Sequence, residues 1–547
     1  MAGLATTLGS GAMTNSIGDI TAASVLLVVG SNTTEAHPVI ALRMKAAVRQ
    51  HGARLILIDP RGIELSEFAD LHLRPRPGTD VAVLNAMAQV ILAEGLENRQ
   101  FIAERTENVE GLAKAVAGWT PERAEGVSGV AAQSIREAAR AYAGARAAAV
   151  FWAMGVTQHV SGTDNVKALS NLALLCGQIG RPGTGLNPLR GQNNVQGACD
   201  MGALPNVFPA YQAVTSEETR RKFAAGWNVG VEQLSATPGL TVTEMMDAAL
   251  EGRLRALLIL GENPMLSDPN LHHVEKALAA LDLLVVQDLF LNETAALADV
   301  VLPGSSFAEK SGTFTNTERR VQLVRPALPA PGEARQDWAI SLDLAQRLGA
   351  AWTYNDPSEI FEEMARLTPS YAGMSHARLQ SGGLQWPCPT PDHPGTPILH
   401  VERFTRGNGL FSAVDYRPPA EMTDADYPFI LSTGRILFHW HGGTLSRRSA
   451  GLDWLAPAAE VEIHPEDAEE LGIAGGETVE VRSRRGAVRA HARLTPRSPR
   501  GTVFMTFHFA EAAANLLTVD AVDPVAKIPE FKVAAVKVER IAEVAAA

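Results

Sequence analysis

The chain has 547 residues, of which 46% are hydrophobic, so it has enough apolar side chains for three or four separately packed domains. Acidic residues outnumber basic ones by 60 to 48, and the formal net charge is −12. An acidic chain is a poor candidate for a general nucleic-acid-binding protein. The first twenty residues do not resemble a signal peptide, and no run of eighteen apolar residues occurs. We therefore expect a cytoplasmic protein with no direct membrane span.

The three cysteines, Cys176, Cys199 and Cys388, lie far apart and form no C-x-x-C pair. This spacing argues against a disulfide framework and against a self-contained zinc or iron–sulfur site, and it favours a reducing compartment. Cys176 falls on the apolar face of an expected helix and is predicted to be core. Cys199 is interpreted as a small buried filler, with a metal-ligand role as the weaker alternative.

The first part of the chain has the pattern of a βαβ unit. The apolar runs "SVLLVVGSN" (24–32) and "RLILIDPR" (54–61) flank a segment with helical periodicity, which predicts two parallel strands. The small-residue stretch "ATTLGSGAMTNS" before them is expected to be a loop inside the fold. Ligands of open α/β sheets bind beyond the carboxyl ends of the strands. The candidate ligand-binding residues at these ends are Gly30, Ser31, Asn32, Glu35, Asp59 and Arg61, and "RPRPGTD" (74–80) is expected to reach the same edge.

A nucleotide is the ligand that these strand ends suit best. The G-x-G-x-x-G fingerprint of NAD-binding folds is absent, but helix N-termini can still hold a diphosphate. A carboxylate such as Asp59 or Asp80 can accept the two N–H hydrogens of guanine, a pattern that adenine does not offer. The structural alternative for Asp59 is a turn cap before Pro60. Both interpretations stay open at this point.

Residues 81–146 are mostly helical in pattern, and "AAAVFWAMG" (147–155) is a further buried strand that ends in Gly155 and is followed by Gln158. A helix over 165–180 leads into the polar loop "GLNPLRGQNNVQGACDMG" (185–202). Arg190 stands in this loop among glycines and amides. A lone arginine is usually a solvated or structural charge, but its planar fork also matches a carboxylate through two parallel hydrogen bonds. The loop therefore makes Arg190 a candidate for binding a small carboxylate or oxyanion.

A second block repeats this design. The apolar runs at 254–263 and 281–294 again end in polar clusters, and "GENPMLSDP" resembles "GSNTTEAHP". The repetition favours two related half-sites for one large nucleotide cofactor. Its candidate residues are Gly261, Glu262, Asn263, Gln287 and Asp288.

The rest of the chain divides into linkers and a small β-barrel. Proline-rich stretches at 327–334 and 381–397 look like linkers. After about residue 400, short alternating strands with glycine turns predict the barrel. "LSTGRILFHWHGGTLSRR" (431–448) holds Arg435, His439 and His441. The two histidines could bind a metal if they shared a strand face, but no carboxylate or cysteine converges on them. Hydrogen bonding to an anionic or pterin-like ligand is the favoured interpretation, and no metal ligand is assigned.

Three stretches resemble a known family: "NPLRGQNNVQGACDMG", "QDLFLNETAALADVVLPGSSFAEKSGTFTNTERRVQ" and "GRILFHWHGGTLSRR". They are similar to the catalytic (alpha) subunits of formate dehydrogenases in the molybdopterin, or dimethyl sulfoxide reductase, family. The resemblance covers essentially the whole chain. It implies a multi-domain α/β fold with two related open nucleotide-binding domains and a C-terminal β-barrel of the double-psi type.

The resemblance also implies a division of the chain. Residues 1–192 would form an α/β domain for one guanine dinucleotide, and 193–304 a second one that lacks its N-terminal part. Residues 305–400 would be a remnant of the iron–sulfur or connecting domain, and 401–547 the barrel domain that binds the dinucleotide.

The implied cofactor is bis(molybdopterin guanine dinucleotide) with molybdenum or tungsten. One dinucleotide would meet the loops at Gly30–Glu35, Asp59, Arg61 and Asp80, and the other those at Gly261–Asn263 and Gln287–Asp288. The pterins would be lined by Gly155, Gln158, Arg435, His439, His441, Asn515 and Lys532. By resemblance, Arg190 holds the carboxylate of formate, which is oxidised to CO2. The electrons would then pass to partner subunits that carry iron–sulfur or flavin groups and that could be linked to NAD.

This sequence departs from the family pattern in one respect, because it lacks the metal ligand that the family carries. Family members carry a cysteine or selenocysteine metal ligand, followed by histidine, a few residues before the stretch with which this sequence begins, and a four-cysteine cluster segment further upstream. We therefore expect a C-terminal part of a longer protein, inactive alone, with the iron–sulfur cluster in the missing part. The alternatives are a non-catalytic structural relative, against which Arg190 and both polar clusters argue, and another oxyanion reductase, which "RGQNNVQG" disfavours.

Overall fold

The computed structural model describes residues 1–541 and divides the chain into two compact units. Unit 1 contains Met1–Gly191, Leu266–His272 and the chain from Ile398 onward. Unit 2 contains Gln192–Met265 and His273–Pro397. The last residues of the predicted barrel domain, 542–547, lie outside the described residues. The division of the chain into four domains by ligand stays a prediction.

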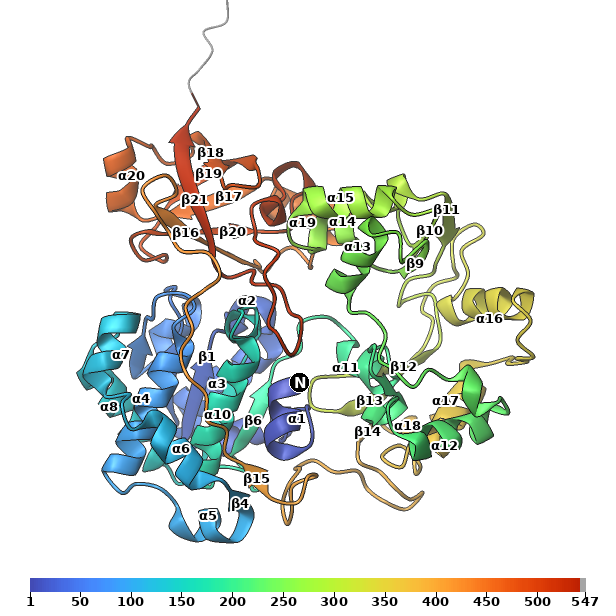
Figure 1. Cartoon of the computed structure of the whole chain (residues 1–547), viewed down its shortest axis with the longest axis horizontal. Coiled ribbons are helices and arrows are strands. Elements are labelled where there is room, and N and C mark those ends of the chain that lie inside the picture. The colour runs from blue at the N-terminus through green and yellow to red at the C-terminus, as the bar shows by residue number, and fades with distance from the viewer. Residues whose placement is uncertain (542–547) are drawn as a thin grey trace, which may run out of the picture. The chain divides into compact units, whose positions relative to one another are not determined.

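Unit 1 begins with a five-stranded parallel sheet in the order β3-β2-β1-β5-β6 (Figure 1). Helices cover both faces, which is why every residue of β1 is buried and the strands carry continuous apolar runs. The βαβ prediction is confirmed. The strands are β1 (Val25–Val29), β2 (Arg54–Ile58), β3 (Leu71–Leu73), β5 (Ala148–Trp152) and β6 (Gly185–Pro188).

The two central strands are a switch point of the sheet. The connection from β1 to β2 runs through α3 (Pro38–His51), which packs on one face, and the connection from β5 to β6 runs through α10 (Gly162–Cys176), which packs on the other. Consecutive crossovers on opposite faces leave a crevice at the carboxyl ends of β1 and β5.

Two glycines allow these strand ends to approach each other. The Gly155 N–H donates to the Gly30 carbonyl over 3.1 Å, and a Cβ on Gly155 would lie only 2.5 Å from that oxygen. Gly30 itself has φ +54°, a conformation that favours glycine. Side chains at either position would separate the strand ends that form the crevice.

The N-terminal stretch is inside the fold, as expected, but it is not a loop. Ala2–Leu8 forms helix α1, with Leu4 and Leu8 fully buried. The small residues allow the helix to lie directly on α10: a Cβ on Gly3 would meet Val166 at 2.8 Å. Packing of this kind decides the conformation of a short helix more than local propensity does.

The remaining helices of residues 1–191 and of the C-terminal region lie around the sheet and the barrel. They are α2 (Thr33–Ala36), α4 (Asp80–Ala93), α5 (Arg99–Arg105), α6 (Val109–Val116), α7 (Pro121–Ser128), α8 (Ala132–Ala143), α9 (Met154–Thr157), α19 (Ala450–Leu455) and α20 (Pro465–Leu471). The short strands β4 (Thr106–Glu107) and β15 (Gly409–Leu410) pair with each other.

The C-terminal part of unit 1 is a closed six-stranded barrel, which confirms the predicted barrel. Its interior is one apolar cluster, because inward-facing valines and alanines alternate with polar residues along β18 and β19. In barrel order the strands are β16 (Phe429–Gly434), β20 (Thr502–Thr506), β17 (Glu460–Ile463), β19 (Ala487–Leu494), β18 (Thr478–Arg482) and β21 (Ala534–Arg540).

Unit 2 holds a second, three-stranded parallel sheet, as the repeated block predicts. Its strands are β9 (Ala256–Leu260), β10 (Leu283–Asp288) and β11 (Val300–Pro303). One face packs on α13 (Val242–Leu250) and α15 (Leu271–Ala279) through Ile259, Leu284 and Val286. On the other face Leu258, Leu260, Leu283 and Val300 are each at least 40% exposed. Parallel sheets are normally covered on both faces, so this apolar face is unusual.

The rest of unit 2 is mostly short elements. They are α11 (Val195–Asp200), α12 (Glu217–Trp227), α16 (Asp337–Arg347), α17 (Pro357–Leu367), α18 (His376–Leu379), the pair β7 (Val207–Phe208) and β8 (Gln212–Ala213), and a sheet of β12 (Gly312–Thr315), β13 (Arg320–Val324) and β14 (Leu384–Gln385). Helix α14 (Pro264–Ser267) follows β9.

The prediction of a linker over 381–397 is wrong. This segment contains β14 and the buried Trp386, and the fully buried Arg319 donates hydrogen bonds to the carbonyls of Thr396 and Pro397. The prolines of this segment therefore lie in a packed part of the fold and not in a linker.

Within residues 1–541, no helix combines the length and apolar character needed to cross a membrane.

We predict that Gly155→Ala lowers the stability of unit 1 by about 1–3 kcal/mol, because the added methyl group would overlap the Gly30 carbonyl. The matched control is Gly126→Ala in α7, where a Cβ meets nothing within 4 Å and should stabilise the helix by about 0.5–1 kcal/mol. Thermal unfolding of the two variants measures both effects. Equal melting temperatures for Gly155→Ala and the wild type would contradict the close contact.

Candidate functional site

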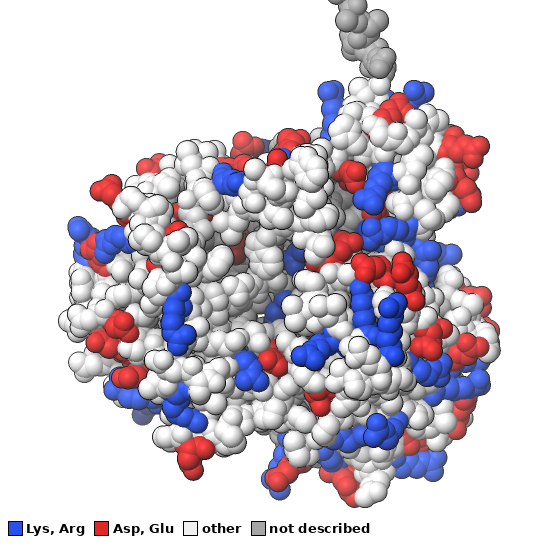
Figure 2. Space-filling model, turned by 180° about the vertical axis from the view of Figure 1, so that it is seen from behind, with Lys and Arg blue, Asp and Glu red and all other residues white. Residues whose placement is uncertain are grey.

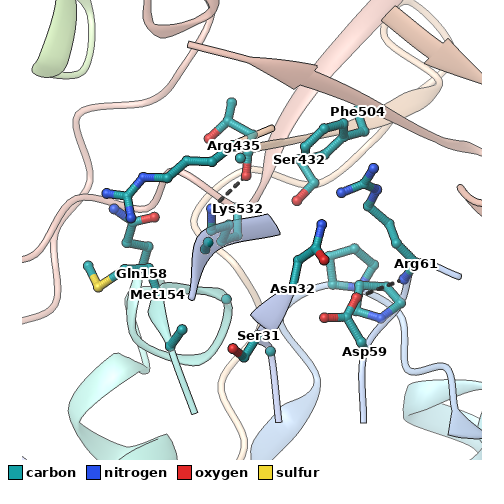
Figure 3. Close-up of a pocket in the computed structure, with 18 of the residues that line it drawn as sticks. Ser31, Asn32, Asp59, Arg61, Met154, Gln158, Ser432, Arg435, Phe504 and Lys532 are labelled. Carbon is teal, nitrogen blue, oxygen red and sulfur yellow. Dashed lines mark hydrogen bonds between the residues drawn. The ribbon is translucent and has the colours of Figure 1, made fainter. Parts of the chain in front are cut away.

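A cavity opens at the carboxyl ends of β1, β2 and β5, on the side where the barrel strands β16 and β20 also end (Figure 3). Its empty space is about 990 Å³, part of which is open to solvent. The loop 74–80 contributes Pro75 to Gly78, as its sequence position suggests.

Ten of the predicted ligand-binding residues line this cavity. They come from four strand ends of the sheet and the barrel, from the start of α4 and from the segment before β21, regions up to 500 residues apart in sequence. These ten residues are Gly30, Ser31, Asn32, Asp59, Arg61, Asp80, Gly155, Gln158, Arg435 and Lys532.

Asn32 gives the clearest sign that the cavity holds a polar ligand. Both its amide nitrogen and its amide oxygen are buried, and neither has a hydrogen-bond partner within the described residues. Figure 3 shows the side chain standing in the middle of the group of lining residues. Leaving such groups unpaired costs about 1–3 kcal/mol each. A ligand that offers both a donor and an acceptor would satisfy Asn32.

Asp59 both caps the turn around Pro60 and lies at the cavity, so the two interpretations of this residue do not exclude each other. Its Oδ1 accepts the Arg61 N–H over 2.9 Å, which is the expected turn cap around Pro60, and the residue also lines the cavity. Burial, opposed by the Arg61 N–H, raises the pKa of Asp59 to about 6. Burial also raises the pKa of Asp80, at the start of α4. Two buried carboxylates on one side of a cavity suit a ligand with N–H donors.

Arg61 is held rigidly beside them. Its Nη2 pairs with Glu462 of β17 over 2.8 Å, and its guanidinium lies 3.4 Å from the centre of the Phe504 ring. Arg61 Nε is buried without a partner among residues 1–541. Glu35 does not line the cavity, because it pairs with Arg497 over 2.9 Å.

Lys532 is a buried cation in the same cavity. Its Nζ donates to the carbonyl of Thr433. Burial, together with the neighbouring Arg435 and Arg61, lowers the pKa of Lys532 to about 7, and Asp59 opposes this shift. An anionic ligand such as a diphosphate would relieve the clustering of positive charge.

Arg190 lies next to the cavity rather than in its lining, between the lining residues Leu189 and Gly191. Its Nη2 donates to the carbonyl of Gly11 over 3.2 Å, and its own carbonyl is 2.6 Å from Nε2 of His37. The guanidinium of Arg435 packs against the neighbouring glycine: a Cβ on Gly191 would lie 2.7 Å from Arg435 Nη1. The arginine is therefore held from its main chain and its side chain.

The histidine pair is separated from the cavity. Nε2 of His439 donates to the carbonyl of Ala456 over 2.7 Å, and the ring of His441 makes an edge contact with Phe507. Burial lowers the pKa of His441 to about 4. Within residues 1–541 no group of three or more histidine, cysteine, aspartate or glutamate side chains is arranged to hold a metal.

The second predicted set lies in unit 2, at the carboxyl ends of β9 and β10. The Gly261 N–H donates to the Gln287 carbonyl over 2.9 Å, and Asn263 Oδ1 accepts from the Thr294 hydroxyl over 2.7 Å. Gln287 donates to Asp337, and Asp288 accepts from Asn292. Most of these side chains thus have partners within the chain. Glu262 stands between Gly261 and Asn263, and a ligand role for this set stays a prediction.

Asn515 also has partners in the chain: its amide nitrogen donates to the carbonyls of Leu266 and Ser267 in unit 1, and its buried oxygen has no partner among the described residues.

The stretch 185–202 is not all loop, because it contains β6 and α11. Cys199 is buried in α11, in agreement with the filler interpretation, and Cys176 is core.

Sequence reasoning missed several lining residues, among them His37, Met154 and Phe504. His37 and Met154 lie within two residues of Glu35 and Gly155, which the sequence did single out, so their place in the chain was a usable signal. Phe504 lies within a barrel strand, and only the barrel's closure brings it to the cavity.

Acidic and basic side chains are interspersed on the face that Figure 2 shows. This pattern differs from the basic stripe of nucleic-acid-binding surfaces.

Comparison with known proteins identifies the class of protein to which this fold and cavity belong. Residues 3–347 match the molybdopterin oxidoreductase family, and residues 429–535 match the molydopterin dinucleotide binding domain. The chain therefore belongs to the molybdopterin oxidoreductase family. A solved structure, acetylene hydratase from Pelobacter acetylenicus, has the same fold: its TM-score is 0.78 at 20% identity, covering 99% of this chain and 80% of that one.

Curated relatives narrow the class further. Over 543 residues the chain is 51% identical to F420-dependent formate dehydrogenase 1 subunit alpha of Methanococcus maripaludis, covering 98% of this chain and 80% of that protein. Over 553 residues it is 41% identical to formate dehydrogenase H of Escherichia coli K12, covering 100% of this chain and 77% of that protein. The chain is thus a homologue of formate dehydrogenase alpha subunits.

We predict that Lys532→Met stabilises the chain purified without cofactor at pH 7 by about 1 kcal/mol or more, since it removes a buried charge. The pKa of Lys532 is about 7 in the folded chain against 10.5 in the unfolded chain. The unfolded state binds more protons between these values, so wild-type stability should rise with pH across this window, and the variant should lose this rise.

The same variant should bind GDP at least about tenfold more weakly, because a charged hydrogen bond contributes about 1.5–3 kcal/mol. Lys114→Met, at an exposed position in α6, is the control for both measurements. Denaturation curves at several pH values and calorimetric titration give the answer. A variant that is less stable than wild type, with unchanged GDP affinity, would refute the anionic-ligand role.

Proposed function

We propose that this chain is the catalytic-subunit part of a formate dehydrogenase that oxidises formate to CO2. The observation that carries the proposal is the anchored Arg190 beside a cavity lined by two buried carboxyl groups, a buried lysine and Asn32, whose amide atoms have no partner among residues 1–541. The similarity to formate dehydrogenase alpha subunits supports it. Formate loses two electrons and one proton in this reaction.

The proposed cofactor is bis(molybdopterin guanine dinucleotide) with molybdenum or tungsten, and the residues around the cavity fit one of its halves. Buried atoms of Asn32 and Arg61 have no partner within the described part of the chain. Asp59 and Asp80 offer acceptors for guanine, and Lys532 offers a cation for phosphate. The second half would meet the strand ends of β9 and β10 in unit 2. When bound, the metal centre accepts the two electrons.

The chain's own residues perform two tasks in this proposal. Arg190 pairs its two parallel N–H groups with the formate carboxylate, which orients the C–H bond. Arg190 is only partly exposed to solvent, so that pairing is screened less than it would be in bulk water.

We further propose that the native protein carries a segment ahead of residue 1 that supplies the cysteine or selenocysteine ligand, the adjacent histidine and an iron–sulfur cluster. None of the cysteines in the described residues lines the cavity. The exposed apolar face of β9, β10 and β11 is a surface that an additional element of the same chain would cover. The relatives above are longer than the aligned region, since this chain covers 77–80% of their length.

The intact mass of the protein isolated from its source cells tests this extension. We expect a mass well above 58.3 kDa and a Cys–His or selenocysteine–His pair upstream of residue 1. A mass of 58.3 kDa without bound metal would instead favour a non-catalytic structural relative.

Electron-transfer subunits are the proposed partners. NAD-linked iron–sulfur or flavin subunits are one candidate, and the name of the Methanococcus maripaludis relative points to coenzyme F420 as the other electron acceptor. Formate-dependent reduction of NAD⁺ and of F420 by the purified complex distinguishes them.

For the formate-oxidising holoenzyme we predict that Arg190→Lys lowers kcat/KM for formate by about 10- to 100-fold. Lysine keeps the charge but loses the fork, and charged hydrogen bonds contribute about 1.5–3 kcal/mol. Arg146→Lys, at an exposed position, is the control. Steady-state kinetics at equal metal content are the measurement, and wild-type kinetics for Arg190→Lys would rule out the carboxylate-binding role.

A further inference from the structure

His37 makes a contact that no sequence motif predicts. It lies at the junction of α2 and α3, the two helices that follow the switch-point strand β1, and it lines the cavity. Its Nε2 is 2.6 Å from the carbonyl oxygen of Arg190, which is 153 residues away in sequence. A carbonyl can only accept a hydrogen bond, so the proton of this contact resides on Nε2.

The main chain of His37 is fixed on both sides. Its N–H donates to the Thr33 carbonyl over 2.8 Å, and its carbonyl accepts the Ala41 N–H over 3.0 Å. Pro38 follows at the first turn of α3, which restricts the backbone of His37 further. A side chain on so rigid a support can hold its partner in place.

The protonation state of His37 suits this task. Its Nδ1 is buried without a partner among residues 1–541. Burial lowers the pKa of His37, Arg435 lowers it further, and the hydrogen bond to Arg190 opposes both. The ring therefore stays neutral at physiological pH with its hydrogen on Nε2, and Nδ1 remains an acceptor.

The main chain on both sides of Arg190 is also fixed. On one side Leu189 N–H donates to the Trp152 carbonyl over 2.8 Å, as the last bond of the sheet. On the other side comes Gly191, against which Arg435 packs. Between them, the Arg190 carbonyl has His37 as its hydrogen-bond donor, and the Arg190 guanidinium reaches Gly11.

We propose that His37 is a positioning residue for Arg190: its Nε2–H fixes the Arg190 main chain and thereby the direction from which the guanidinium approaches the substrate. This inference rests on the proposed function for what Arg190 binds. The contact itself is a property of the fold and can be tested without activity.

Two substitutions distinguish the loss of the hydrogen bond to Arg190 from the loss of the imidazole ring of His37. In His37→Gln the amide nitrogen takes nearly the place of Nε2 and can still donate to Arg190. In His37→Asn the amide reaches only the place of Nδ1, so the contact is lost. His491→Asn, an exposed histidine of the barrel, is the control.

The first experiment is hydrogen–deuterium exchange of peptides spanning residues 185–195, on the full chain. Faster exchange in His37→Asn, with wild-type exchange in His37→Gln and His491→Asn, is the expected result. Wild-type exchange in His37→Asn would overturn the proposal. A long-range ¹⁵N–¹H histidine spectrum of the same protein should show hydrogen on Nε2 of His37. Hydrogen on Nδ1 would also overturn it.

The second experiment measures formate kinetics of the holoenzyme at equal metal and pterin content. His37→Asn should raise KM for formate about fivefold, the effect of one neutral hydrogen bond, and His37→Gln should not. In an Arg190→Lys background His37→Asn should have no further effect, because the two residues act as a unit. An equal effect in both backgrounds would contradict the proposal.

The two arms also separate this inference from the proposed function. If Arg190→Lys leaves formate kinetics unchanged, the carboxylate-binding role of Arg190 fails, while exchange and tautomer still report on the His37 contact. If exchange is unchanged in His37→Asn but Arg190→Lys is impaired, the proposed function stands and the positioning role fails.

Discussion

The backbone contact between Gly30 and Gly155 is the constraint on which the site depends. It brings the carboxyl ends of two parallel strands within hydrogen-bonding distance at the point where the crossovers change faces of the sheet. Here the absence of two side chains keeps the crevice open for Asn32, Asp59 and Gln158, which follow the adjoining strands.

The polar groups in this crevice destabilise the folded chain by itself. Asn32 has no partner within the described residues, Asp59 is a carboxyl whose pKa burial raises, and Lys532 is an amine whose pKa burial lowers. A fold selected only for stability would replace them by apolar residues. Their presence is explained if a ligand with complementary donors, acceptors and negative charge satisfies them, and stability is then coupled to ligand binding.

The barrel contributes to the same site through a rigid ion pair. Glu462 on β17 holds Arg61, which also stacks on Phe504 of β20. Two regions that are 400 residues apart in sequence thus form one wall. Because Arg61 loses little side-chain entropy on binding, such preorganisation increases affinity without adding contacts.

Much of this architecture could be predicted from the sequence, and the reasons for the misses are physical. Apolar runs that end in glycine and polar residues located β1, β2, β5, β9 and β10, because a buried parallel strand needs an unbroken apolar segment. Helix α1 was missed because its stability comes from tertiary contacts of small residues with α10. The packed segment around Trp386 was missed because proline content alone does not distinguish a linker from a buried turn.

The residues of the site also fall into those that the sequence could indicate and those that only the structure reveals. Residues next to strand ends, such as Asn32 and Asp59, could be found because chain position and chemistry coincide. Phe504 and the bond from His37 to Arg190 could not, because they depend on which distant segments the fold brings together. The sequence motif around Arg190 indicates a carboxylate ligand, but only the structure reveals what holds the arginine.

A cryo-electron microscopy map of the native protein isolated from its source cells would show directly whether the crevice binds a nucleotide. We predict density for a guanine dinucleotide in the crevice between β1 and β5, within hydrogen-bonding distance of Asn32 and with its phosphates near Lys532. A crevice that contains only water, in a protein with full metal content and formate-oxidising activity, would contradict it.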